Sequence, residues 1–102
     1  MLGKSLLASF AGNWEVQYLN GVLETKCGKL RQGRRHLEQS VNLNPSSAAS
    51  HAALALVLAQ LKDLPEAKEQ MQKALALGDS SGEVKRTLSK LPQYLDGAGS
   101  EH

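Results

Sequence analysis

Cysteine, proline and aromatic residues are all scarce in this chain of 102 residues. The single cysteine, Cys27, excludes a disulfide within the chain and says little about the compartment. Aromatic residues make up only 4% of the sequence, and Ala and Leu supply most of the apolar share of 41%. This composition favours helices that pack closely through small residues over a sheet of β-branched and aromatic side chains.

Long apolar runs and a strong net charge are also missing. No apolar stretch approaches the ~20 residues that cross a bilayer, so we expect no membrane span. The stretch from Leu6 to Ala11 is interrupted by Ser9 and is shorter than the ~7–15 residues of a signal core, which favours a soluble, cytoplasmic protein. The net charge of +2 is too small to favour nucleic acid or an anionic membrane as a partner.

No pattern in the sequence indicates catalysis. The three histidines (His36, His51 and His102) are far apart, and no paired His or Cys spacing indicates a metal site. Cys27 has no His or acidic residue placed to activate it as a nucleophile. We therefore expect a protein that is not an enzyme and that needs no metal or cofactor.

What the sequence does contain is a repeated spacing. The segments 14–47 and 48–81 are equal in length and share one pattern of small and large apolar residues. Gly21, Leu30, Gly33, Leu37, Ser40 and Leu43 in the first copy recur as Ala55, Leu64, Ala67, Met71, Ala74 and Leu77 in the second. A fixed period of this length predicts an all-α helical-repeat solenoid.

Start and stop signals predict four helices within the two copies. The first is expected over Trp14–Lys26 with Asn13 as its N-cap and Gly28 as its stop. The second is expected over Lys29–Leu43, because the residue before Pro45 disfavours helix. The third is expected to follow Ser46 or Ser47 and to run to Leu61. The fourth is expected to start at a capping Asp63 and to end at Gly78.

A capping segment is expected over residues 82–95, before a polar and disordered tail at 96–102, and a fifth helix forms its first part. Ser80 and Glu83 have the spacing of a capping box, and the helix must stop before Pro92. Val84, Leu88 and Leu91 form its apolar stripe, which leaves Lys85, Arg86 and Lys90 on the solvent side. Residues 1–13 carry Leu2, Leu6 and Phe10 at helical spacing and form either a short helix or the remnant of a preceding repeat.

The two copies, 14–47 and 48–81, resemble repeats of the tetratricopeptide repeat family. The second copy carries a large and then a small residue, Leu54 and Ala55, in its first helix, and Ala67, Met71 and Ala74 in its second. The first copy matches at Gly21, Gly33, Leu37, Ser40 and Pro45 but departs from the pattern at Asn20. The second copy departs from it at His51, Leu58 and Asp79. The resemblance implies two hairpins of this type followed by a capping helix. It also implies a role in protein–protein recognition, as an adaptor or scaffold, through a concave face.

The concave face is the first candidate site. If the family arrangement holds, it is lined by Glu15, Tyr18, Val22, Thr25, Ala49, Ala52, Leu56 and Ala59. We expect this groove to accept a peptide or an amphipathic helix of a partner protein. The alternative is that a neighbouring repeat, the fifth helix or a second copy of the chain covers it, and the last case would make the chain a homo-oligomer. Some domains of the tetratricopeptide family hold the C-terminal carboxylate of chaperones with lysine and asparagine side chains on the first helices of successive repeats. Tyr18, Val22 and Ala53 stand where the first lysine and the asparagines of that clamp would lie, so we do not expect chaperone-tail binding.

A basic cluster is the second candidate site. Lys26, Lys29, Arg31, Arg34 and Arg35 lie around the start of the second helix, where cations oppose the helix dipole. One interpretation is a site for an acidic peptide, a phosphate or a nucleic-acid backbone. The other is a solvated convex surface, which we favour because no aromatic residue is interleaved with these charges.

Overall fold

Five helices make up the part of the chain that the computed structural model describes, residues 12–78 and 82–90. They are α2 (Trp14–Lys26), α3 (Leu30–Leu43), α4 (Ala48–Gln60), α5 (Leu64–Leu77) and α6 (Glu83–Leu88). No strand occurs within these ranges, which confirms the prediction of an all-α protein. The expected N-terminal helix, Leu91 and the expected tail at 96–102 lie outside the described residues.

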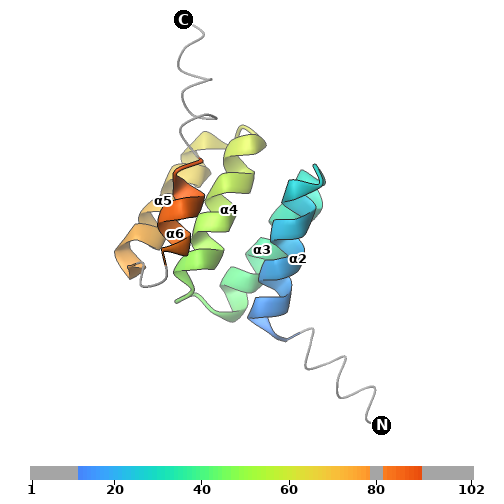
Figure 1. Cartoon of the computed structure of the whole chain (residues 1–102), viewed down its shortest axis with the longest axis horizontal. Coiled ribbons are helices and arrows are strands. Elements are labelled where there is room, and N and C mark those ends of the chain that lie inside the picture. Colours follow the sequence, from blue (N-terminus) through green and yellow to red (C-terminus); the bar gives the residue numbers. More distant parts are fainter. Residues whose placement is uncertain (1–11, 79–81, 91–102) are drawn as a thin grey trace, which may run out of the picture.

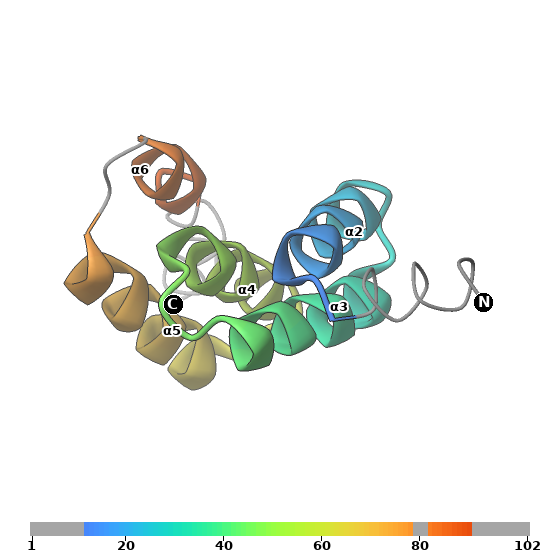
Figure 2. The same ribbon diagram turned by 90° about the horizontal axis from the view of Figure 1, so that it is seen from below.

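The helices form two antiparallel pairs and a single final helix (Figure 1). α2 packs closely against α3, α4 packs closely against α5, and α4 also contacts α2, α3 and α6. Seen along the helices, α2 and α6 lie on either side of α4, whereas α3 and α5 lie together on the other side of the molecule (Figure 2). α4 is therefore the central element of the fold.

The helix ends follow the predicted signals in most places. The Asn13 side chain accepts a hydrogen bond from the backbone N–H of Glu15 at 2.8 Å, as expected for the N-cap of α2. α3 begins one residue later than predicted, after Lys29, and Ser47 caps α4 by accepting a hydrogen bond from the N–H of Ser50 at 3.2 Å. α4 ends at Gln60, one residue short of the predicted end.

Two of the predicted caps are wrong. Asp63 occupies the N-cap position of α5, but its side chain makes no capping hydrogen bond, and Pro65 in the first turn instead suits the helix start. α6 begins at Glu83 and its N-cap is Gly82, not a capping-box serine. Gly82 has a φ of 78°, a left-handed conformation that glycine adopts without the usual steric cost.

The two hairpins share their bounds and their turn geometry. Shifting α2 and α3 by one repeat length reproduces the bounds of α4 and α5. The N–H of Lys29 donates to the carbonyl of Glu24 at 2.8 Å, and at the equivalent position of the second copy the N–H of Asp63 donates to that of Leu58 at 2.9 Å. The turn residues before them, Gly28 and Lys62, are both left-handed, with φ of 85° and 71°. The first helix of each pair therefore ends in the same hydrogen-bonded turn with a left-handed residue.

Lys62 is the only residue other than glycine with a positive φ among the described residues, and this position carries a steric cost. We expect Lys62→Gly to raise the free energy of unfolding by about 0.5–1 kcal/mol, measured by urea denaturation. Lys68→Gly, in the exposed interior of α5, is the matched control and is expected to lower it by about 1 kcal/mol. A loss of stability in Lys62→Gly would contradict this account of the turn.

Glycine allows α2 and α3 to approach closely. A Cβ atom on Gly21 would lie 2.5 Å from the Cγ atom of Leu37, and one on Gly33 would lie 2.9 Å from the carbonyl oxygen of Gly21. The second pair has Ala55 and Ala67 at the corresponding positions, both almost completely buried. Small residues at these four positions thus bring the backbones of each pair together.

Gly33→Ala tests this contact. Alanine normally stabilises a helix by up to about 1 kcal/mol relative to glycine. Here its Cβ would meet the backbone of α2, so we expect the free energy of unfolding to fall by about 1–3 kcal/mol. Gln39→Ala, on the exposed side of the same helix, is expected to change it by less than about 0.5 kcal/mol. Equal effects of the two substitutions in denaturation curves would show that the helices do not meet at Gly33.

α4 is buried on nearly every side, as its apolar sequence predicts. Ala52, Ala55, Val57, Leu58 and Ala59 have no exposed surface. Most of this burial comes from α2, α3 and α5, and α6 adds a second cluster in which Val84 packs with Ala52 and Ala74. Of the residues between Ser50 and Ala59, only Leu56 remains partly exposed.

A chain of buried hydroxyl groups anchors the first turn of α4. Ser40 of α3 donates a hydrogen bond to the Trp14 carbonyl at 2.8 Å, and its oxygen lies 2.7 Å from the hydroxyl oxygen of Ser50. A hydroxyl has one hydrogen, so Ser50 is the donor to Ser40, and Ser47 in turn donates to Ser50 at 2.9 Å. The start of α2, the end of α3 and the start of α4 are therefore joined by one polar chain.

His51 joins α4 to the preceding loop and to α5. Its exposed fraction is only 4%, and its Nε2–H donates to the Pro45 carbonyl over 2.8 Å. Its Nδ1 lies 2.7 Å from the side-chain amide of Gln70. His51 thus packs between helices with both ring nitrogens hydrogen-bonded.

Candidate functional site: a groove between α2, α4 and α6

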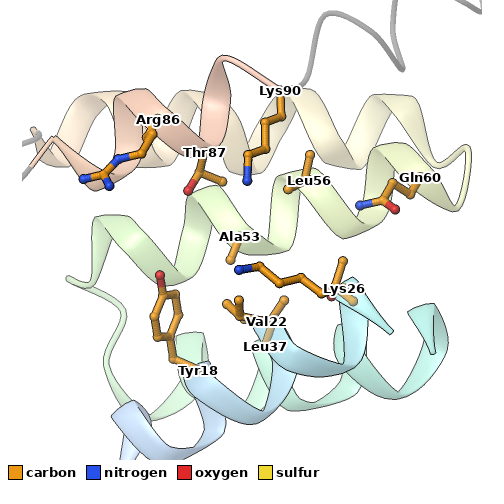
Figure 3. A pocket seen from close by; sticks show the side chains of 11 residues that line it. Tyr18, Val22, Lys26, Leu37, Ala53, Leu56, Gln60, Arg86, Thr87 and Lys90 are labelled. Carbon is orange, nitrogen blue, oxygen red and sulfur yellow. The ribbon is translucent and has the colours of Figure 1, made fainter. Parts of the chain in front are cut away.

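A groove of about 390 Å³ lies between α2, α4 and α6 (Figure 3). Its walls come from α2 on one side and from α6 and Lys90 on the other, and α4 forms its floor with one residue of α3. The residues that line it are Tyr18, Val22, Thr25, Lys26, Leu37, Ala53, Leu56, Gln60, Arg86, Thr87 and Lys90. We call this surface the groove.

The floor of the groove is apolar. Leu37 and Ala53 are buried beneath it, and Val22 and Leu56 are partly exposed at its surface. Helical periodicity brings these residues together, since Ala53, Leu56 and Gln60 lie at i, i+3 and i+7 on α4. An apolar floor that stays accessible can bury apolar side chains of a bound segment.

The walls of the groove are basic. Lys26, Arg86 and Lys90 are exposed, and none of the described residues that line the groove with them is acidic. In Figure 3 the ammonium groups of Lys26 and Lys90 reach into the groove from opposite walls, whereas the Arg86 side chain extends along one end. Within the described ranges, none of these three cations forms an ion pair.

The uncharged polar side chains in the groove differ in their surroundings. The Thr25 hydroxyl donates to the Gly21 carbonyl in its own helix at 2.7 Å, so its hydrogen is already engaged. Tyr18 stands near the Arg86 end and stacks at a tilt on Trp14, with ring centroids 6.4 Å apart. Gln60 lies at the opposite end and places an amide there.

Half of the residues predicted for the concave face line the groove. Tyr18, Val22, Thr25 and Leu56 do so. Ala52 and Ala59 were expected to line it as well, and this prediction is wrong, because both are fully buried. Ala52 packs in one cluster with Val84 of α6, whereas Ala59 belongs to the main core.

Two further predicted residues lie away from the groove. Glu15 is exposed in the first turn of α2, and Ala49 is half-buried in the first turn of α4. Neither is among the residues that line the groove. The groove is therefore shorter than the predicted concave face, because α6 packs over the first part of α4.

The basic walls of the groove were not predicted from the sequence. Arg86 and Lys90 were assigned to solvent, and Lys26 to a cluster on the second helix. A signal for Lys26 was present, because Tyr18, Val22 and Lys26 lie at i, i+4 and i+8 and so share one stripe of α2. No comparable signal existed for α6, because the angle at which it crosses α4 decides which of its residues face α2.

The predicted basic cluster is divided in the structure. Lys26 belongs to the groove, and Lys29 lines a shallow hollow with Gly28. Arg31 lines that hollow as well, and together with Arg34 and Arg35 it lines a further hollow that includes two acidic side chains. The members of this further hollow are Arg31, Arg34, Arg35, Glu38, Leu61, Lys62 and Asp63. Arg34 pairs there with Glu38, with 3.4 Å between Nε and Oε2. Two carboxylates in this hollow offset part of its positive charge.

Comparison with known proteins identifies no relative, because no protein-family model and no curated protein matches the chain. The resemblance to tetratricopeptide repeats therefore stays a prediction. Among the described residues, no helix has the length and apolar character that a membrane crossing requires. The same residues hold no group of three or more His, Cys, Asp or Glu side chains that could bind a metal ion.

Proposed function

We propose that this chain is a helical-repeat module that binds a segment of another protein in the groove, as an adaptor or scaffold. The single observation that carries the proposal is the apolar floor around Val22, Ala53 and Leu56, which no described helix covers. Burial of apolar side chains is the main source of affinity in most such contacts. A groove of this kind suits a peptide or an amphipathic helix.

The repeated geometry supports the repeat part of the proposal. Helix bounds and turn hydrogen bonds recur at the period of the sequence repeat, and small residues occupy the contact between the helices of both pairs. Stacked pairs of this kind form extended concave surfaces in solenoids. The expected resemblance to tetratricopeptide repeats points to the same face.

Polyanion binding, the competing prediction, has less support. The hollow around Arg31 and Arg35 contains Glu38 and Asp63, and Arg34 is already paired. A surface for a nucleic-acid backbone is expected to present cations without such carboxylates, usually with aromatic side chains between them. The groove is therefore the better candidate site.

Selection of random peptides on the immobilised protein, followed by affinity measurements on the selected binders, tests the groove. We expect Leu56→Asp to weaken their binding about tenfold or more, because the new charge would be desolvated against the apolar floor. The helical circular dichroism spectrum should be kept, since Leu56 is only partly buried.

Leu75→Asp is the matched control for this experiment. Leu75 is 59% exposed on α5 and does not line the groove, so the same change there should leave affinity unaltered. Binders that are insensitive to Leu56→Asp, or no selected binder at all, would contradict the proposed function.

A further inference from the structure

The charged residues that line the groove within the described part of the chain are all positive. Lys26 lies on the α2 wall, and Arg86 and Lys90 lie on the opposite wall. Among the described residues, the groove thus carries three positive charges and no carboxylate, whereas the hollow around Arg34 mixes four cations with two carboxylates. The whole chain carries a net charge of only +2, so this concentration is local to the groove.

The three cations of the groove have no ion-pair partner within the described part of the chain. Arg34 pairs with Glu38, and Lys73 lies 3.6 Å from Glu69, whereas Lys26, Arg86 and Lys90 make no ion pair with any described residue. Like charges that face one another across a narrow gap repel each other. An anionic occupant between the two walls would relieve this repulsion.

We infer that the segment bound in the groove is acidic as well as apolar, a short amphipathic helix with Asp or Glu on both sides of its apolar stripe. This inference rests on the proposed function and names the chemistry of the partner. Apolar side chains of the segment pack on Val22 and Leu56. Carboxylates on its two flanks meet Lys26 on one wall, and Arg86 with Lys90 on the other.

The shape of the site favours a helix over an extended strand. From Ala53 to Gln60 the floor follows α4 for about 10 Å at the rise of an α-helix. About two turns of a helix match this length. A helix carries an apolar stripe with polar residues on both flanks, whereas a strand points its side chains to two opposite faces and cannot reach a floor and two walls together.

The charge content of selected peptides tests the inference directly. We expect peptides selected from a random library to combine apolar residues at i and i+3 or i+4 with Asp or Glu on both flanks. Their affinity should fall when salt is raised from about 0.05 M to about 0.5 M, because exposed charges are screened. Groove binders that are neutral or basic would overturn the inference.

A double substitution, Lys26→Gln with Lys90→Gln, tests the two walls. We expect the affinity of the acidic binders to fall about fivefold, mainly through slower association, and their salt dependence to weaken. Lys68→Gln is the matched control, because Lys68 is exposed on α5 and makes no ion pair with a described residue. Equal affinity of wild type and the double variant would also overturn the inference.

The two levels of the proposal fail in different ways. If selected peptides lose affinity in Leu56→Asp but are not acidic, the groove binds protein segments and only the charge inference is wrong. If Leu56→Asp leaves the affinity of the peptides unchanged, the proposed function is itself wrong. If a second copy of the chain occupies the groove, the mass measured by light scattering should rise with concentration, and Leu56→Asp should abolish this rise. That outcome would overturn the inference of an acidic partner.

Discussion

The rest of the structure depends on the burial of α4. This helix contacts α2, α3, α5 and α6, and most of its side chains from Ser50 to Ala59 are inaccessible to solvent. Because the other four described helices all pack on α4, the side chains of α4 set the distances between these helices. The groove is the part of α4 that α2 and α6 leave uncovered, and Leu56 is the residue that this arrangement exposes.

A helix that is buried on nearly every side could pack in several registers, and polar contacts at its first turn select one. Ser50 bonds to Ser40 and Ser47, and His51 bonds to the Pro45 carbonyl and to Gln70. A buried polar group that loses its partner costs stability, so a shifted α4 would be penalised at each of these groups. The apolar residues supply the driving force, and the polar residues supply the specificity.

Much of the fold could be predicted from local signals, because helix ends are governed by nearby residues. Asn13, Gly28 and Pro45 mark the bounds of α2 and α3 to within one residue. The start of α6 lies one residue after the start of the predicted segment 82–95, but its cap was predicted wrongly, because Gly82 in a left-handed conformation takes the N-cap position instead of a serine. The groove was predicted only in part, since tertiary packing decides that α6 covers Ala52 and that Arg86 and Lys90 face α2.

The shortness of α6 has a consequence for the groove. A helix of this length has little stability of its own, so its position depends on Val84 packing with Ala52 and Ala74. Ala74 lies on α5, outside the groove, yet it supports the element that carries one basic wall. Sequence changes in the interior of this protein can therefore alter the shape of the groove, even where every residue that lines it stays the same.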